Sequence, residues 1–238
     1  MDTRRIIDNA IEIPVVTSFS RFGFETRRRL AKWEPLDGYD LRGRVITLTG
    51  ATSGLGRAAA EQLARCGATL VLVGRNPERN AETAAAITSA TGNDGVSHWA
   101  ADMGDLDQVR SLADHILGAH DRLDVLIHNA GALTASREVA SDGTEATVAS
   151  QVVGPFLLTN LLLDRLEASA PSRVLTMSSG GMYAAPLQVD GLQMNEDSYR
   201  GTDQYARAKR AQVILNEMWA HRVGERGIRF HSMHPGWA

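Results

Sequence analysis

Short, continuously apolar segments alternate with amphipathic helical segments from residue 44 onward, and this alternation limits the possible folds more than any other feature of the chain. The apolar segments lack the every-second-residue pattern of a strand with one wet face, so we expect both of their faces to be buried. Such strands, connected by helices, form a parallel sheet with right-handed crossovers. The expected fold class is therefore α/β, a doubly wound parallel sheet between two helical layers. We expect strands at 44–50, 68–74, 96–102, 123–131, 172–179 and 228–236, and helices at 55–66, 78–91, 105–119, 144–168 and 203–223.

The composition fits one globular domain of this class. The chain has 238 residues, of which 43% are hydrophobic, and a net charge of −3. Domains of this type commonly reach this length without dividing. The near-neutral charge gives no indication of nucleic-acid binding, and we expect none. The single cysteine, Cys66, excludes a disulfide framework and is interpreted as a small core residue of a helix. We expect no metal site.

The sequence has neither an evident membrane span nor an evident secretion signal. The longest stretch without a charged residue, 146–163, has 18 residues but contains Thr, Ser, Gln, Asn and Pro. We therefore interpret it as a buried helix. The chain does not open with a basic region followed by an apolar one. A cytoplasmic protein is expected, with peripheral membrane contact as an option for its N-terminal region.

Residues 1–43 differ from the rest and are expected to form an amphipathic N-terminal extension to a domain that spans 44–238. A basic helix with aromatic anchors can lie on an anionic membrane, and residues 1–33 are the candidate for such contact. The same features allow packing on the domain or on a partner chain, and these alternatives stay open. The aromatic and basic residues concerned are Phe19, Phe22, Phe24, Arg27, Arg28, Arg29, Lys32 and Trp33.

The first expected strand runs directly into the glycine-rich sequence TGATSGLG, residues 49–56. Gly50, Gly54 and Gly56 have no Cβ, so the backbone can turn sharply and approach a pyrophosphate, to which the following helix offers its N–H groups and its dipole. Glycines alone are weak evidence, but their position between a strand and an apolar-periodic helix is the context that a dinucleotide site requires. We therefore expect a Rossmann-type fold that binds a nucleotide.

The end of the second expected strand indicates which nucleotide is bound. An acidic residue there binds the adenosine ribose 2′-hydroxyl of NAD(H), whereas this chain has Gly74 and Arg75 and no acid before Glu78. A guanidinium suits the 2′-phosphate of NADP(H), so this cofactor is favoured and NAD(H) is the second choice. Arg75 as a solvated loop residue is the simpler alternative. Asp102, after the third strand, is either an acceptor for the adenine amino group or a loop cap.

The sequence DQYARAKRAQ, residues 203–212, places Tyr205 and Lys209 one helical turn apart on the same face. Such a pair can be a surface tyrosine packed over a lysine stem. It can also be an acid–base pair in which the ammonium lowers the pKa of the phenol from its free value of about 10. Only Tyr205 among the four tyrosines has a basic residue four positions later. With a nucleotide cradle upstream, this favours the acid–base pair, and we expect Arg207 and Arg210 to face away from the cleft.

These residues resemble the short-chain dehydrogenase/reductase family over residues 44–236. The resemblance rests on five motifs in the family's order and spacing. Within the family, segments such as KRAQVILNEMWA are most similar to the branch related to retinol dehydrogenases, and in that branch to the group of dehydrogenase/reductase family member 12. The motifs are TGATSGLG (49–56), HNAG (128–131), VLTMSSGG (174–181), YARAK (205–209) and HPG (234–236).

The resemblance implies a role for each matching residue. Tyr205 would be the general acid/base, Lys209 would lower its pKa and bind the nicotinamide ribose, and Ser179 would hold the substrate oxygen. Ser178, on the opposite face of the strand, is the alternative serine. Asn129 would stabilise the central strand. The implied cofactor-binding residues are Gly50, Thr52, Ser53, Gly54, Leu55, Gly56, Arg75, Asp102, Met103, Asn129, Ala130, Gly131, Tyr205, Lys209, Pro235 and Gly236.

Two departures from the family pattern bear on the mechanism. The family has an Asn in the long helix that holds a water leading to the Lys, and here Gln151 stands at that position. Its extra methylene keeps the amide but changes its reach, so Gln151 is a candidate catalytic residue whose relay is either kept or weakened. Relatives also continue beyond HPGWA (234–238) into a cofactor-covering, substrate-binding segment. We therefore expect either a truncation before that segment or a domain without it.

The resemblance implies an NADP(H)-dependent oxidoreductase that interconverts a hydrophobic alcohol and its carbonyl compound. Tyr205 would give a proton to the developing alkoxide while Ser179 hydrogen-bonds the same oxygen. A homo-oligomer paired through helices 144–168 and 203–223 is expected by analogy. The alternatives are a nucleotide-binding scaffold or regulator with weak or no catalysis, and isomerase or epimerase chemistry.

Overall fold

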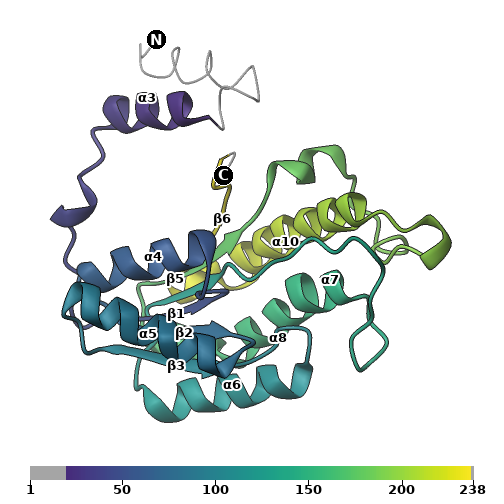
Figure 1. The fold of residues 1–238 in the computed structure, drawn as a ribbon. Coiled ribbons are helices and arrows are strands. Elements are labelled where there is room, and N and C mark those ends of the chain that lie inside the picture. Colours follow the sequence, from purple (N-terminus) through teal and green to yellow (C-terminus); the bar gives the residue numbers. More distant parts are fainter. Residues whose placement is uncertain (1–19, 237–238) are drawn as a thin grey trace.

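The computed structural model describes residues 20–236, which include a six-stranded parallel sheet in the order β3-β2-β1-β4-β5-β6 (Figure 1). This topology confirms the α/β, Rossmann-type class expected from the sequence. The strand order reverses between β1 and β4, at the centre of the sheet, and in a parallel sheet all carboxyl ends meet at one edge. The strands are β1 Val45–Thr49, β2 Thr69–Gly74, β3 Val96–Ala100, β4 Val125–His128, β5 Ser172–Met177 and β6 Ile228–Met233.

Helices cover both faces of the sheet (Figure 1). Helices α4 and α5 pack on one face, and α6, α8 and α9 pack on the other. The longest helix, α10, contacts β6 and the segment between α7 and α8. The helices are α3 Arg21–Ala31, α4 Gly54–Arg65, α5 Pro77–Thr91, α6 Leu106–Ala119, α7 Ala146–Val148, α8 Gly154–Leu161, α9 Leu163–Ala168 and α10 Gly201–Val223.

Alternate residues of a central strand enter two different cores. In β2, Leu70 and Leu72 pack on the side of α4 and α5, whereas Val71 and Val73 pack on the side of α6 and α8. All four side chains are buried. A strand with two dry faces has no place for polar residues, and this explains why its sequence is continuously apolar.

The segment 144–168 is not the single helix that we predicted. Helix α7 passes into a π-turn, Ala149–Val153, which leads into α8, and the chain breaks again at Leu162 before α9. Pro155 contributes to the irregularity, because it has no N–H for the carbonyl of Gln151 four residues earlier. The inner side of the segment 144–168 is nevertheless fully buried at Leu158 and Leu162, as expected. Turns of this kind often occur at functional sites.

Cys66 is not a core residue, and this interpretation of the sequence was wrong. It caps the C-terminus of α4, is half-buried, and its Sγ donates to the carbonyl of Leu36 at 3.3 Å. The helix ends here because Gly67 follows with φ +86°, a left-handed conformation that favours glycine.

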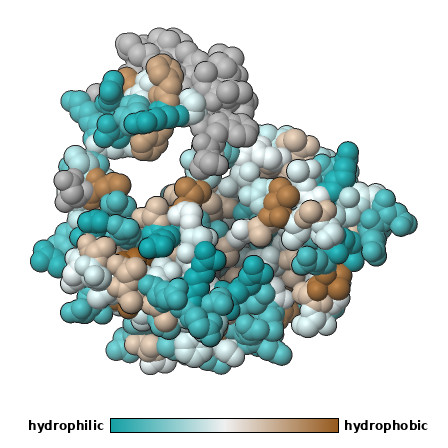
Figure 2. Space-filling view, in the orientation of Figure 1, coloured by the Kyte–Doolittle hydropathy of each residue, from teal (hydrophilic) through white to brown (hydrophobic). Residues whose placement is uncertain are grey.

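Helix α3 stands apart from the sheet (Figures 1 and 2), and the short helical turn Leu36–Gly38 leads from it towards β1. The aromatic side chains of α3 and of Trp33, which follows it, remain exposed, with fractions of 68% for Phe22, 53% for Phe24 and 48% for Trp33. These three side chains are therefore not buried against the domain, as packing of the extension on the domain would require. Phe19 lies outside the described residues. Among residues 20–236, no helix is both long and apolar enough to cross a membrane.

Candidate active site

The turn between β1 and α4 is held closely against the loop that follows β4. Asn129 Nδ2 donates to the carbonyls of Thr49 and Gly50, at 3.1 Å each. A Cβ on Gly56 would lie 2.1 Å from the Gly50 carbonyl oxygen and 2.6 Å from Asn129 Nδ2, so only glycine fits there. The first turn of α4 consequently approaches β1 closely, and its N–H groups and dipole suit a bound pyrophosphate.

A cleft of about 730 Å³ lies at the carboxyl ends of the strands and crosses the reversal of strand order between β1 and β4. Doubly wound sheets bind nucleotides at this position. Its lining includes every residue that the sequence assigned to the cofactor, namely Gly50, Thr52, Ser53, Gly54, Leu55, Gly56, Arg75, Asp102, Met103, Asn129, Ala130, Gly131, Tyr205, Lys209, Pro235 and Gly236. Ser178 and Ser179 also line the cleft, whereas Gln151 does not.

Several residues in the lining were missed by the sequence interpretation. Most of them are direct neighbours in the chain of residues that we did assign, so spacing offered a signal that we did not use. Arg79 is different, because only the turn into α5 brings it to the same end of the cleft as Arg75. The missed residues are Val73, Gly74, Asn76, Arg79, Ala101, Ala132, Ser150, Met177 and His234.

Two arginines line the cleft on the β2 side of the sheet. Arg75 directly follows β2, and Arg79 lies in the first turn of α5. Asn76 caps this helix, since its Oδ1 accepts from the Arg79 N–H at 2.7 Å, and the cap fixes the turn that places both arginines at this end. Arg57, in contrast, is exposed and does not line the cleft. Two guanidinium groups suit a phosphate ligand.

Asp102 is a loop cap, one of the two alternatives that the sequence left open, and it also lies in the lining of the cleft. Its Oδ1 accepts from the Gly104 N–H at 2.8 Å, so it caps its own loop. The same residue lines the cleft next to Met103. Gly154 of α8 keeps this loop in place, because a Cβ there would lie 1.9 Å from the Met103 carbonyl oxygen.

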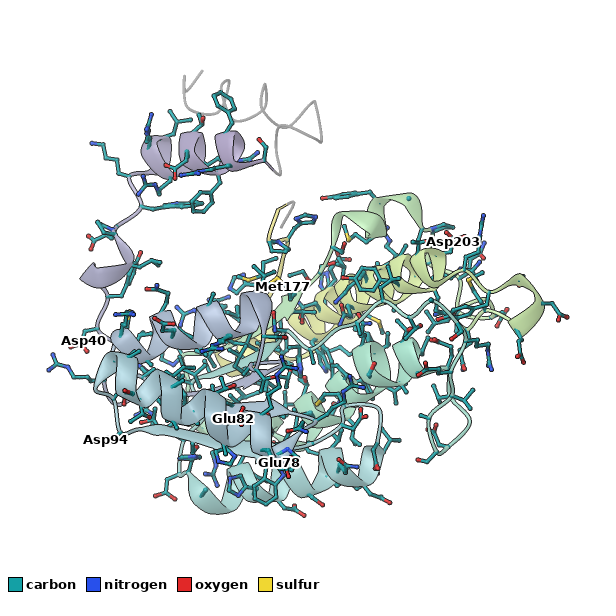
Figure 3. The ribbon with its side chains drawn as sticks, in the orientation of Figure 1. Asp40, Glu78, Glu82, Asp94, Met177 and Asp203 are labelled. Carbon is teal, nitrogen blue, oxygen red and sulfur yellow. The ribbon has the colours of Figure 1, made fainter. Side chains whose placement is uncertain are left out.

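Lys209 is buried on the β5 side of the cleft, with an exposed fraction of 2%. Its Nζ donates to the carbonyl of Met177 at 2.8 Å and lies 5.3 Å from the centroid of the Tyr205 ring. Figure 3 shows Met177 beside α10. Burial lowers the pKa of Lys209 to about 8. Neither Arg207 nor Arg210 lines the cleft, as we expected.

The two serines after β5 lie in different surroundings. Ser178 is buried, and its Oγ donates towards the carbonyl of Lys209 at 3.5 Å. Ser179 is half-buried, and its Oγ accepts from the Gly181 N–H at 3.3 Å. Ser178 is therefore turned towards the backbone of α10, whereas Ser179 keeps its hydroxyl proton for a ligand.

Gln151 lies in the π-turn behind Gly131 and is 1% exposed. Its Nε2 donates to the carbonyl of Ala132 at 2.7 Å, while its Oε1 accepts no hydrogen bond from residues 20–236. A Cβ on Gly131 would lie 3.1 Å from this Oε1 and 3.4 Å from Lys209 Nζ. The amide oxygen of Gln151 and the ammonium of Lys209 thus both lie beside Gly131.

The HPG turn after β6 completes the cleft. His234 Nδ1 accepts from the Gly236 N–H at 2.7 Å, which fixes Pro235 and Gly236 in the lining. The ring packs against Gly180, where a Cβ would lie 2.8 Å from His234 Nε2. Burial lowers the pKa of His234, so the imidazole is neutral near pH 7 and can act as this acceptor.

This end of the cleft can hold and protonate an oxygen atom. It combines a phenol, an ammonium and a hydroxyl from Tyr205, Lys209 and Ser179. In the part of the chain that the structure describes, no group of three His, Cys, Asp or Glu side chains could hold a metal ion.

Comparison with known proteins agrees with this arrangement. The model of the short chain dehydrogenase family matches residues 44–238. The chain is 38% identical to human dehydrogenase/reductase SDR family member 12 over 82% of its own length and 61% of the relative's length. It is 34% identical to human retinol dehydrogenase 13, again over 82% of its length and 59% of the relative's. It thus spans about three fifths of the length of these relatives.

A solved structure gives the same picture. A short-chain dehydrogenase structure from Shigella flexneri, complexed with NADP, superposes with a TM-score of 0.67 at 28% identity. The match covers 82% of this chain and 78% of that one.

Proposed function

Because the chain belongs to the short-chain dehydrogenase/reductase family, we propose that it is an NADP(H)-dependent oxidoreductase that interconverts a hydrophobic alcohol and its carbonyl compound. The observation that carries the proposal is that Tyr205, Lys209 and Ser179 lie in one cleft with the glycine cradle, the turn of residues 50–56 between β1 and α4. The names of the retinol dehydrogenase relatives support a hydrophobic alcohol as the substrate class.

The residues of the cleft fit a dinucleotide. Gly50 and Gly56 allow the turn to pack closely, because a Cβ on them would collide with the backbone of Ala130 and of Gly50, and residues 54–56 offer the N-terminus of α4 to the pyrophosphate. Arg75 and Arg79 support NADP(H) over NAD(H), because their charge complements a 2′-phosphate. When bound, the nicotinamide supplies or accepts the hydride.

The side chains of this protein handle the oxygen and its proton. In carbonyl reduction, the Tyr205 hydroxyl donates its proton to the substrate oxygen as negative charge develops there. Lys209 stabilises the resulting phenolate, because its ammonium lies close to the ring in a buried site. Ser179 donates a hydrogen bond to the same oxygen. In alcohol oxidation, Tyr205 takes the proton back.

The test is NADPH oxidation by the full-length protein against a panel of aliphatic, aromatic and isoprenoid aldehydes and ketones. Tyr205→Phe should lower turnover by at least about a hundredfold, because general acid catalysis is lost, and should leave NADPH affinity nearly unchanged. Tyr39→Phe is the matched control, since Tyr39 is exposed and lies outside the cleft. NADPH binding without turnover on the whole panel would favour the scaffold function instead.

We also propose that the protein forms a homo-oligomer through α8 and α10. These helices expose Phe156 and Met218, with fractions of 45% and 41%. Phe156 stacks on Trp219 at 5.6 Å, so the two helices present one apolar face. Light scattering after size exclusion should give a multiple of 25.7 kDa, and Phe156→Asp should shift it towards the monomer.

We finally propose that the protein is cytoplasmic and that residues 1–33 make peripheral contact with anionic membranes. In the described part, α3 exposes Phe22 and Phe24 and carries a single acidic residue, Glu25. Its basic residues suit anionic headgroups. Flotation with phosphatidylserine vesicles tests this, and equal flotation of a chain lacking residues 1–33 would contradict it. The basic residues of α3 are Arg21, Arg27, Arg28 and Arg29, and Lys32 follows at its C-cap.

A further inference from the structure

Gln212 lies on α10 and reaches across to the π-turn between α7 and α8. Its Nε2 donates to the main-chain carbonyl of Gln151 at 2.5 Å, and its side chain is 3% exposed. In a regular α-helix, this carbonyl would accept from the residue four positions later. That residue is Pro155, which has no N–H. Gln212 therefore supplies a donor in place of the one that Pro155 lacks.

The side chain of Gln151 leads from this anchored backbone to Lys209. Its Nε2 is held by the carbonyl of Ala132, and its Oε1 points to the same edge of Gly131 as Lys209 Nζ. A buried oxygen without a donor is destabilising, so it has a strong requirement for a hydrogen bond. The ammonium has three N–H groups, of which the Met177 carbonyl accepts one.

A second buried oxygen belongs to the same site. Gln212 Oε1 also accepts no hydrogen bond from the described residues. Tyr205, Lys209 and Gln212 are spaced four and three residues apart, so they follow one face of α10. The side of the helix that presents the phenol and the ammonium also presents the amide that holds the π-turn.

We propose, on the basis of the function proposed above, that Gln212 is a positioning residue for Lys209. By holding the Gln151 carbonyl, it fixes the π-turn so that Gln151 Oε1 stays on the side of Gly131 where the ammonium lies and is linked to it through one shared water. The ammonium then has a second acceptor besides Met177 and keeps its position next to the Tyr205 ring.

Two variants of Gln212 test this role. Gln212→Met keeps the volume and removes the amide, whereas Gln212→Glu keeps the shape and donates only while its carboxyl group is protonated. Gln204→Met is the matched control, because Gln204 is fully buried on the same helix. Its amide serves Leu192 and Met194 instead of the π-turn.

The first measurement does not depend on turnover. Protein labelled with ε-¹³C-lysine is titrated by NMR, with the Lys209 signal identified by its loss in Lys209→Arg. Gln212→Met should shift the pKa that the Lys209 signal reports, and Gln204→Met should leave this pKa unchanged. An unchanged Lys209 titration in folded Gln212→Met would overturn the proposal, even if the wild type turned over no substrate.

The second measurement is the pH profile of kcat. Gln212→Met should lower kcat by about tenfold to a hundredfold through misplacement of Lys209, with little change in NADPH affinity. Gln212→Glu should lose activity progressively as pH rises and its carboxyl group ionises. A wild-type profile in either variant would contradict the proposal. If Gln212→Met does not fold, the profile and the Lys209 titration of Gln212→Glu decide. An inactive wild type would refute the proposed function alone.

Discussion

The ammonium of Lys209 lies 5.3 Å from the centroid of the Tyr205 ring, one turn away on α10, and is anchored to the carbonyl of Met177 at the end of β5. The helix alone places the two side chains on one face. The anchor in β5 adds the burial, which makes the charge of Lys209 effective because water no longer screens it.

This burial predicts how stability depends on pH. The pKa of Lys209 is about 8 in the folded protein and 10.5 in the reference state, so the buried ammonium destabilises the fold fully below pH 8. Between pH 8 and 10.5 the unfolded chain binds the extra proton, and stability therefore rises with pH. Relative to Lys209→Met, the wild type should gain about 3 kcal/mol over this range in urea unfolding. A constant difference between the two proteins from pH 7 to 11 would contradict the burial of the charge.

The burial of His128 predicts that stability decreases at acidic pH. Its side chain is fully buried beside Thr159, with Nε2 and Oγ1 2.8 Å apart, and burial lowers the pKa of His128 from 6.5 to about 3. As pH falls below 6.5, the unfolded chain takes up a proton that the folded chain does not, so stability decreases. His128→Gln should lose less stability than the wild type between pH 6.5 and 4 in urea unfolding. His98→Gln, at an exposed position in β3, should behave like the wild type.

Cofactor choice depends on charge at the β2 end of the cleft. Arg75→Ala and Arg79→Ala should each weaken NADPH binding by about tenfold, because a charge-assisted hydrogen bond to the 2′-phosphate is lost. NADH binding should not change. Arg57→Ala is the control, since Arg57 lies outside the cleft. Equal losses for both nucleotides, measured by quenching of protein fluorescence, would show that these arginines do not select the phosphate.

The glycine cradle should not tolerate a methyl group. In Gly56→Ala the new Cβ would collide with the Gly50 carbonyl and with Asn129, and relieving this overlap should cost about 1–3 kcal/mol of stability and displace the cradle. NADPH binding should be lost with it. Gly118→Ala is the matched control, because a Cβ there meets nothing within 4 Å. Gly118 lies in the last turn of α6, and that change should not destabilise the helix. Calorimetry with and without NADPH measures both effects.

The features of the site that depend on neighbouring residues along the chain could be predicted from the sequence. The residues assigned to the cofactor all line one cleft, because all of them except Tyr205 and Lys209, which lie on α10, stand at the carboxyl end of a strand or in a turn next to one. A parallel sheet brings such ends together whatever the details of packing. The acid–base pair needed only a helix and a spacing of four residues.

The sequence by itself determined the parallel sheet, the cradle and the pairing of Tyr205 with Lys209, because periodicity and spacing act along the chain. Only the tertiary structure decided the rest. It brought Arg79 to the cleft, moved Cys66 from the expected core to a helix end and broke the helix around Gln151. It also joined the Gln151 carbonyl to Gln212, 61 residues away. These features depend on which groups fill a shared space, and no local pattern encodes a contact between segments so far apart.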